Sequence, residues 1–230
     1  MVIFLGGSWG VGEWDFEKIS GPSVVNYFSE HDTTLNLCKS SIGSIEQLNK
    51  LKSFLDRYKY NHSDVIYWLV HNPLVNVPVE KIYTNHASLH DSVMSLLLEQ
   101  LAEANEYAQK NDLLINLVGA SCDLDEVDIS QFNKLNIRLS SWGKLLAEDY
   151  PVSIFSHQME HLPNLKKELE IHRPDLLEEY YKISSISFGK RRCMLKNKEM
   201  FRSFHPTALG HLKLQTYLCS EEAWPEYKRK

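Results

Sequence analysis

A serine lies among glycines directly after a short apolar run, in the opening sequence MVIFLGGSWGVGEW. Four glycines surround Ser8 within residues 6–12. Two chemistries use such a loop. Glycine backbone can approach a nucleotide phosphate closely, or the loop can present Ser8 as a nucleophile beside backbone N–H groups that stabilise an oxyanion.

The nucleotide alternative is based on Gly6, Gly10 and Gly12, whose spacing matches the GxxxGxG pattern of short-chain dehydrogenases. Those enzymes also need a tyrosine four residues before a lysine, so that the ammonium lowers the phenol pKa. None of the 11 tyrosines has a lysine at that offset, and Trp9 adds bulk where a pyrophosphate would need close backbone approach. The nucleophile hypothesis is therefore favoured, and the dehydrogenase alternative predicts binding of NAD(P).

A serine hydroxyl needs a base to accept its proton, and His205 is the candidate. It lies in the sequence FHPTALGH, where Pro206 suits the first turn of a closing helix. We therefore expect His205 on a loop at the mouth of that helix, where its ring can face the site.

Strands and helices alternate along the chain. The sequence predicts five strands, at Val2–Leu5, Thr34–Leu37, Asp64–Val70, Leu113–Val118 and Val152–Phe155. It predicts helices over Ser23–Glu30, from Ser44 through Leu55 with a Ser44/Gln47 capping box, and over Ser88–Lys110, Pro163–Lys182 and Pro206–Leu218. Such alternation indicates a parallel sheet covered on both faces. Ligands of these sheets bind beyond the carboxyl ends of the strands, so the loops with Ser8, Gly43, Asn72 and the GASCD segment should share one edge.

The four blocks Gly6-Gly7-Ser8, Gly43, Asn72 and His205-Pro206 resemble the SGNH (GDSL-like) hydrolases, in the order that names the family. The phrase GGSWGVGEW is similar to the GDSW-type opening of phage-encoded members, which implies a phage-encoded or virion-associated protein. The resemblance spans nearly the whole chain, in short blocks.

The resemblance implies one domain over residues 1–230 with a three-layer α/β/α fold, flavodoxin-like in its mostly parallel sheet. It also implies hydrolysis of a carboxylic ester, of a carbohydrate O-acetyl group or a lipid, without a metal or cofactor. Ser8 would attack the carbonyl while His205 accepts its proton. The oxyanion would be held by the backbone N–H groups of Ser8 and Gly43 and by the amide of Asn72.

Two further expectations concern what surrounds this site. We expect substrate contacts from Trp9 and Arg202. A helical insertion at about residues 157–200 would shape substrate choice.

Two positions depart from the family pattern. Gly7 stands where the family usually has aspartate, and Arg202 stands three residues before the histidine, where the family has its acid. Some members work as Ser-His dyads with a backbone carbonyl orienting the ring, while Asp15, Glu199 and Asp123 are alternatives for a third member in space. The departures leave open a second class of function, a catalytically inactive SGNH-fold binding or virion-associated protein.

Composition narrows the remaining classes. At 230 residues with 43% hydrophobic content, the chain can bury a substantial core, and a net charge of -5 argues against a nucleic-acid binder. Four scattered cysteines and no signal peptide predict a cytoplasmic protein, and no apolar stretch is long enough for a membrane helix. The sequence HQMEH at 157–161 matches a zinc-peptidase pattern, but a proline ends the segment and no third ligand is evident, so no metal is expected.

A run of six basic residues precedes His205, namely Lys190, Arg191, Arg192, Lys196, Lys198 and Arg202. It is interpreted either as a solvated lid or connection, or as a surface that attracts an anionic substrate towards the site.

Overall fold

We describe a computed structural model of the chain. It describes residues 1–12, 14–15, 18–19, 21–29, 32–61, 63–84, 86–157 and 164–220, with the backbone alone at 14–15 and 18–19.

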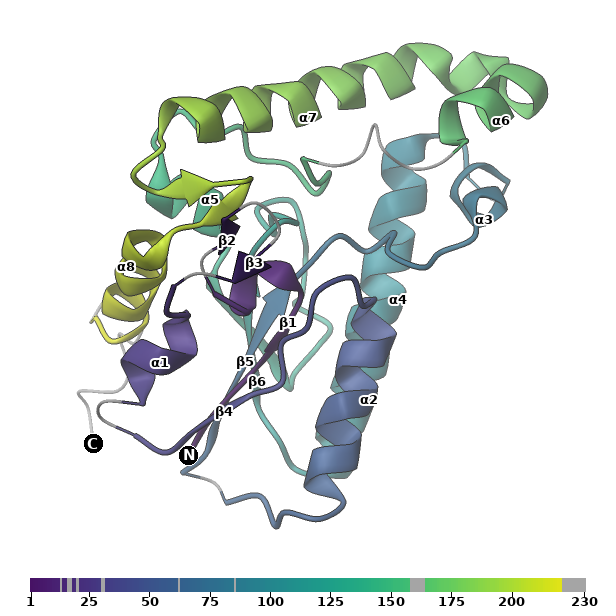
Figure 1. Ribbon diagram of the computed structural model, residues 1–230. Helices are drawn as coiled ribbons and strands as arrows, with labels where there is room; N and C mark the ends of the chain where they lie inside the picture. The colour runs from purple at the N-terminus through teal and green to yellow at the C-terminus, as the bar shows by residue number, and fades with distance from the viewer. Residues whose placement is uncertain are drawn as a thin grey trace.

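The centre of the fold is a parallel sheet of five strands, in the spatial order β4-β1-β5-β6-β7 (Figure 1). The strands are β1 (Val2–Gly6), β4 (Thr34–Asn36), β5 (Val65–Val70), β6 (Ile115–Gly119) and β7 (Leu135–Leu139). Every pairing between them is parallel. This order is that of doubly wound flavodoxin-like sheets, in which the chain reverses direction across the sheet after its second strand. The predicted α/β class is confirmed.

Side chains alternate between two cores because successive residues of a strand point to opposite faces. On β1, Ile3 and Leu5 pack in one apolar cluster, while Val2 and Phe4 pack in the other. The first cluster includes side chains of α2 (Ser44–Leu55) and α4 (Leu89–Lys110), and the second those of α1 (Val24–Phe28), α5 (Trp142–Leu146) and α8 (Ala208–Leu218). The sheet is therefore the middle of three layers.

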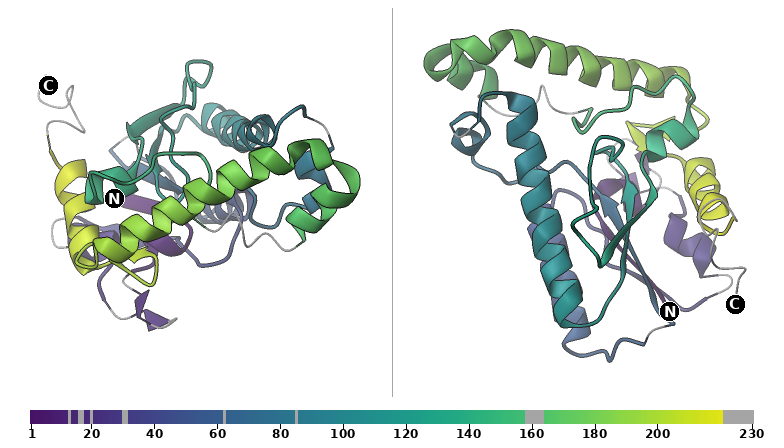
Figure 2. Two further views of the ribbon diagram at one scale, coloured as in Figure 1. Left: turned by 90° about the horizontal axis from the view of Figure 1, so that it is seen from above. Right: turned by 180° about the vertical axis from the view of Figure 1, so that it is seen from behind.

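The remaining elements lie outside these layers. They are η1 (Ser8–Gly10), the small pair β2 (Trp14–Asp15) and β3 (Lys18–Ile19), α3 (Val79–Tyr83), α6 (Leu165–His172), η3 (Pro174–Leu176), α7 (Leu177–Lys196), β8 (Phe201–Arg202) and β9 (His205–Pro206). Figure 2 shows α7 running across the top of the molecule, over the edge of the sheet at which the strands end. None of the helices within the described ranges is long and apolar enough to cross a membrane.

One predicted strand is wrong, and one strand of the sheet was not predicted. Val152–Phe155 is not a strand, because its backbone bonds to a neighbouring loop: Ser153 N–H donates to the Asp123 carboxylate at 2.9 Å, and Asp123 N–H donates to the Ser153 carbonyl at 3.2 Å. The fifth strand is instead β7, whose sequence LNIRL mixes polar with apolar residues. As an edge strand that is only partly buried, it lacks the continuous apolar run of the central strands.

Helix boundaries also differ from those predicted. The N-cap of α2 is Gly43, and the capping box is wrong because Gln47 bonds the Ile42 carbonyl and the Trp68 indole N–H instead. The predicted helix Pro163–Lys182 is interrupted, since α6 ends at His172 and α7 begins after Pro174. The final helix begins at Ala208, which leaves Pro206 in β9.

Candidate active site

The topology singles out one place for a ligand. In a sheet of this order, ligands bind where the connections from two adjacent strands leave in opposite directions, here between β1 and β5. The loop after β1 carries Ser8, and the loop after β5 carries Asn72. Both lie beyond the carboxyl ends of their strands.

Ser8 is the first residue of η1 and is half-buried. Gly7, immediately before it, faces the ring of His71: a Cβ at position 7 would lie 2.7 Å from the ring carbons. Gly10 is equally confined, because a Cβ there would lie 2.4 Å from Cys38 Sγ. Gly7 and Gly10 are therefore explained by close packing against neighbouring side chains, without a phosphate.

His205 lies on a two-stranded hairpin formed by β8 and β9, in register with Arg202. The turn residues Ser203 and Phe204 have φ of 48° and 61°, as both central residues of a type I′ turn require. This turn aims the Ser203 carbonyl oxygen at His205 Nδ1, at 2.7 Å. Since a carbonyl oxygen only accepts, Nδ1 carries the proton, and Nε2 is the proton acceptor of the neutral ring.

Burial lowers the pKa of His205, while the bond to the Ser203 carbonyl opposes this shift. Burial dominates, so the ring is neutral at pH 7. A neutral imidazole with Nδ1 protonated is the form in which a histidine acts as a general base through Nε2.

The loops of Ser8 and His205 are joined by a direct bond. The indole N–H of Trp9 donates to the carbonyl of Phe204 at 3.1 Å, and η1 contacts β9. The residues next in sequence to Ser8 and to His205 are therefore fixed to each other. The structure thus brings the first and last predicted blocks together.

The two middle blocks meet at the same edge. A Cβ at Gly43 would lie 2.8 Å from the Val75 carbonyl oxygen, so the loop before α2 touches the loop after β5. Asn72 is buried, and its Oδ1 accepts from the backbone N–H of Leu74 at 3.0 Å. Because the carbonyl end of this amide is held by its own loop, its NH2 end is the part that can serve a ligand.

Of the two side chains expected to contact the substrate, Trp9 is buried and Arg202 is exposed. Trp9 is only 1% exposed and packs against Trp142, Phe201 and His157, so it is not placed where a substrate in solution would touch it. Its size serves the packing of η1 against the hairpin. Arg202 is exposed beside the site.

Three polar residues beside the site were not found from the sequence. Ser121 Oγ lies 2.5 Å from His71 Nδ1 and accepts the backbone N–H of Asn72 at 3.2 Å, so this buried pair fixes the asparagine. Burial lowers the pKa of His71 to about 4. The third residue is His157, which is 2% exposed and stacks on Trp9. In the sequence, only their position could have indicated these residues, since His71 adjoins Asn72 and Ser121 lies in the GASCD segment.

His157 is a buried imidazole without a hydrogen bond at either ring nitrogen, within the described part of the chain. Its pKa is well below the usual value, because of burial first and then the charges of His205, Lys190, His71 and Arg191. The ring is therefore neutral. The positive charges of Lys190 and Arg191 lie close enough to disfavour protonation of this ring further.

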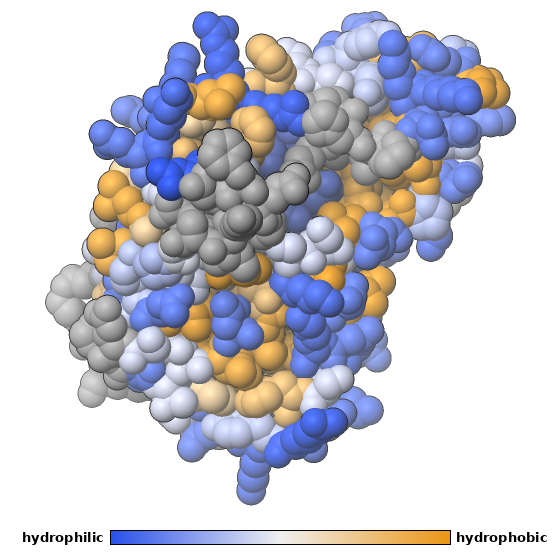
Figure 3. All heavy atoms as spheres, in the orientation of Figure 1, coloured by the Kyte–Doolittle hydropathy of each residue, from blue (hydrophilic) through white to orange (hydrophobic). Residues whose placement is uncertain are grey.

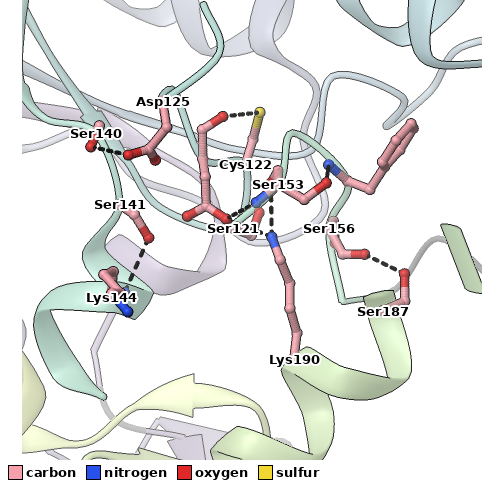
Figure 4. Close-up of polar contacts among 12 residues, drawn as sticks. Ser121, Cys122, Asp125, Ser140, Ser141, Lys144, Ser153, Ser156, Ser187 and Lys190 are labelled. Carbon is pink, nitrogen blue, oxygen red and sulfur yellow. Dashed lines mark hydrogen bonds and ion pairs between the residues drawn. The ribbon is translucent and has the colours of Figure 1, made fainter. Parts of the chain in front are cut away.

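A buried ion pair connects α7 to the same edge of the sheet (Figure 4). Lys190 Nζ donates to Asp123 Oδ2 at 2.7 Å and to the Ser153 carbonyl at 2.8 Å, and it lies 5.3 Å from the ring centre of Tyr150. Burial raises the pKa of Asp123, while Lys190 opposes this. His205 Nδ1 bonds the Ser203 carbonyl and Asp123 is paired with Lys190, so Asp123 is not the group that orients His205. The side chain of Asp15 lies outside the described residues, and Glu199 is exposed.

The zinc pattern at 157–161 falls largely outside the described residues, which include only His157 of it. Among the residues that are described, no three His, Cys, Asp or Glu side chains are grouped so that they could hold a metal ion.

No family model matches the chain, and no curated protein matches it either.

Proposed function

We propose that this chain is a serine-dependent hydrolase of carboxylic esters, with Ser8 as nucleophile and His205 as general base. The observation that carries the proposal is the pairing of the two loops through Trp9 and Phe204, together with the 2.7 Å bond that sets the tautomer of His205. The proton of Ser8 would pass to Nε2, and the alkoxide would attack the ester carbonyl.

The oxyanion would be held by donors that are fixed before the reaction. The backbone N–H groups of Ser8 and Gly43 and the NH2 of Asn72 are the candidates. Asn72 is doubly constrained, by the Leu74 N–H at its side chain and by Ser121 at its backbone. A single preorganised donor of this kind contributes about 3 kcal/mol to transition-state stabilisation.

Ser121 and His71 form a second serine–imidazole pair, which is less suited to the reaction. Ser121 is completely buried, and His71 with a pKa of about 4 is a weak base. A nucleophile must be reached by its substrate, and a base works best with a pKa near the working pH. Ser8, half-buried beside a hairpin, meets the first condition better.

Labelling with a fluorophosphonate, which captures an activated serine, tests the proposal. We expect the wild type and the control Ser130→Ala, at an exposed serine, to label at equal rates, and Ser8→Ala not to label. Mass spectrometry of the labelled peptide should find the adduct on Ser8. An adduct on Ser121 would contradict the assignment of the nucleophile.

The competing function is a catalytically silent binding or virion-associated protein of the same fold. One observation favours it: His205 Nδ1 bonds a neutral carbonyl instead of a carboxylate, which stabilises an imidazolium less. Equal and slow labelling of wild type and Ser8→Ala would support this alternative.

A further inference from the structure

The outer side of α7 carries large apolar side chains that no other described part of the chain covers. Phe188 is 65% exposed and Leu195 57%, and they lie seven residues apart, so they project from the same side of the helix. Single exposed apolar residues are common on proteins. What distinguishes these two is that they line hollows.

Two adjoining hollows lie between the C-terminal half of α7 and the β8–β9 hairpin. One has a volume of about 390 Å³ and the other about 560 Å³, and Leu195 and Phe204 line both. Volumes of this order are typical of sites for small molecules. The floor is apolar, because Phe188, Met194, Leu195, Phe201 and Phe204 contribute to it.

The charged residues around these hollows are all of one sign. They are Arg191, Arg192, Lys198 and Arg202, and none of the described residues that line the hollows is acidic. Figure 3 shows hydrophobic atoms gathered among long hydrophilic side chains over the C-terminal end of α7. A net charge of -5 for the whole chain makes this cationic face a local feature.

We propose that these hollows bind a single anionic amphiphile, an apolar chain that ends in a phosphate or carboxylate group. The apolar chain would lie along Leu195 and Phe204, and the anion would meet the arginines and Lys198 at the rim. This inference goes beyond ester hydrolysis, because it concerns binding and holds equally for a catalytically silent protein.

A single-stranded nucleic acid also combines negative charge with stacking surfaces, but it fits less well. Bases stack on open aromatic faces. Phe188 is exposed, but the ring of Phe204, which lines both hollows, already has the Arg191 guanidinium 5.5 Å from its centre. The other lining residues include the aliphatic side chains of Met194 and Leu195. These favour an alkyl chain over a base.

The hollows lie next to the candidate active site, so a ligand bound in them would lie close to its residues. Ser203 and Phe204 line the larger hollow, and the Ser203 carbonyl holds His205. A bound amphiphile would therefore lie within two residues of the proposed general base.

Calorimetric titration of the full chain with dodecyl phosphate, below its micelle concentration, tests the proposal. We expect saturable binding of dodecyl phosphate and weaker binding of two controls, inorganic phosphate without the chain and dodecyl maltoside without the charge. Arg192→Glu should weaken binding about fivefold to tenfold, the effect of reversing one exposed charge.

Matched variants separate this site from general effects of charge and hydrophobicity. Lys182→Glu changes an exposed cation on the same helix by the same charge, and Ile171→Ser removes an exposed apolar side chain from α6. Neither should alter the affinity, whereas Leu195→Ser should weaken it.

Several results would overturn the proposal. These are no saturable binding of dodecyl phosphate, equal weakening by Lys182→Glu and Arg192→Glu, binding only to anionic vesicles and never to the monomeric amphiphile, or tighter binding of an oligothymidylate. The test is made on wild type and on Ser8→Ala in parallel. Binding that persists in Ser8→Ala keeps this proposal even where the hydrolase proposal fails.

Discussion

The substitution Lys190→Met should destabilise the fold strongly, although methionine keeps most of the apolar stem of lysine. Lys190 is 0% exposed and Asp123 1%. The change removes both hydrogen bonds of the ammonium and leaves a carboxylate buried without its counter-charge. Breaking a buried pair by removing one partner costs about 3–5 kcal/mol. For a chain of this size that corresponds to a fall in Tm of roughly 6–20 °C.

Urea denaturation of a small set of variants measures this cost. Lys196→Met is the matched control, because Lys196 lies on the same helix and its ion pair with Asp149 is 58% exposed on both sides. We expect a change below about 0.5 kcal/mol there. The double variant Lys190→Met/Asp123→Asn should recover most of the loss, since neutral groups of similar shape replace buried pairs with little cost.

The loss should depend on pH in a definite direction. Burial already raises the pKa of Asp123, and removing Lys190 removes the charge that opposes this rise. A carboxyl group whose folded pKa is raised destabilises the fold above that pKa and ceases to do so once it is protonated. The deficit of Lys190→Met relative to wild type should therefore be largest at neutral pH and shrink as the pH falls through the folded pKa of Asp123.

Three results would refute this reasoning. They are a loss below about 1 kcal/mol for Lys190→Met, an equal loss for Lys196→Met, and a double variant no more stable than the single one. Each would mean that α7 is not fixed to the sheet through this ion pair.

Three further predictions concern the site itself. Gly7→Ala should cost about 1–3 kcal/mol in urea denaturation, because the added Cβ would lie 2.7 Å from the His71 ring; an unchanged midpoint would show that the ring does not lie there. His157→Phe should raise the unfolding free energy by about 1 kcal/mol, since it removes two ring nitrogens that have no hydrogen-bond partner among the described residues and keeps an aromatic ring; a comparable loss would mean that the imidazole is bonded. The rate of fluorophosphonate labelling at Ser8 should rise with pH and be half-maximal below 6.5, the usual pKa of histidine, because burial lowers the pKa of His205 and the neutral ring is the base; a midpoint above 7 would exclude His205 in that role.

The central strands could be predicted because continuous apolar runs are what a strand buried on both faces requires. β1 and β5 have such runs, and the run of β6 is interrupted only by Asn116. The bounds of all three strands were predicted to within two residues. β7 was missed because an edge strand needs no such run. Val152–Phe155 was mistaken for a strand because it is largely buried, although it is a loop that lies beneath α7. The local pattern of apolar residues indicates that a segment is buried, but it does not indicate which other segment packs against it.

The burial of Lys190 shows a second limit of sequence. In the chain it is one of six basic residues in a run that is otherwise largely exposed. Whether a lysine enters the core depends on a carboxylate that another segment supplies, here Asp123, 67 residues away in sequence. The order and spacing of the sequence blocks were enough to propose Ser8 and His205. The groups that hydrogen-bond to such residues and shift their pKa values depend on tertiary contacts, which the sequence does not show.

The two departures from the SGNH pattern have a common structural explanation. At Gly7, the space that an aspartate side chain would need is occupied by the ring of His71. At Arg202, the missing carboxylate is replaced at His205 Nδ1 by the carbonyl of Ser203. In both places a group from elsewhere in the chain occupies the site where the acidic side chain of the family pattern would lie.

A carbonyl can replace one function of the acid and not the other. In serine proteases, the wrong histidine tautomer costs about ten-thousand-fold in rate. The Ser203 carbonyl avoids that cost because it accepts only from a protonated Nδ1. Being neutral, it would add little to the stability of the imidazolium that the proposed proton transfer from Ser8 would form. If the hydrolase proposal holds, the site should therefore be correctly oriented but slow, and the type I′ turn at Ser203 and Phe204 would maintain that orientation.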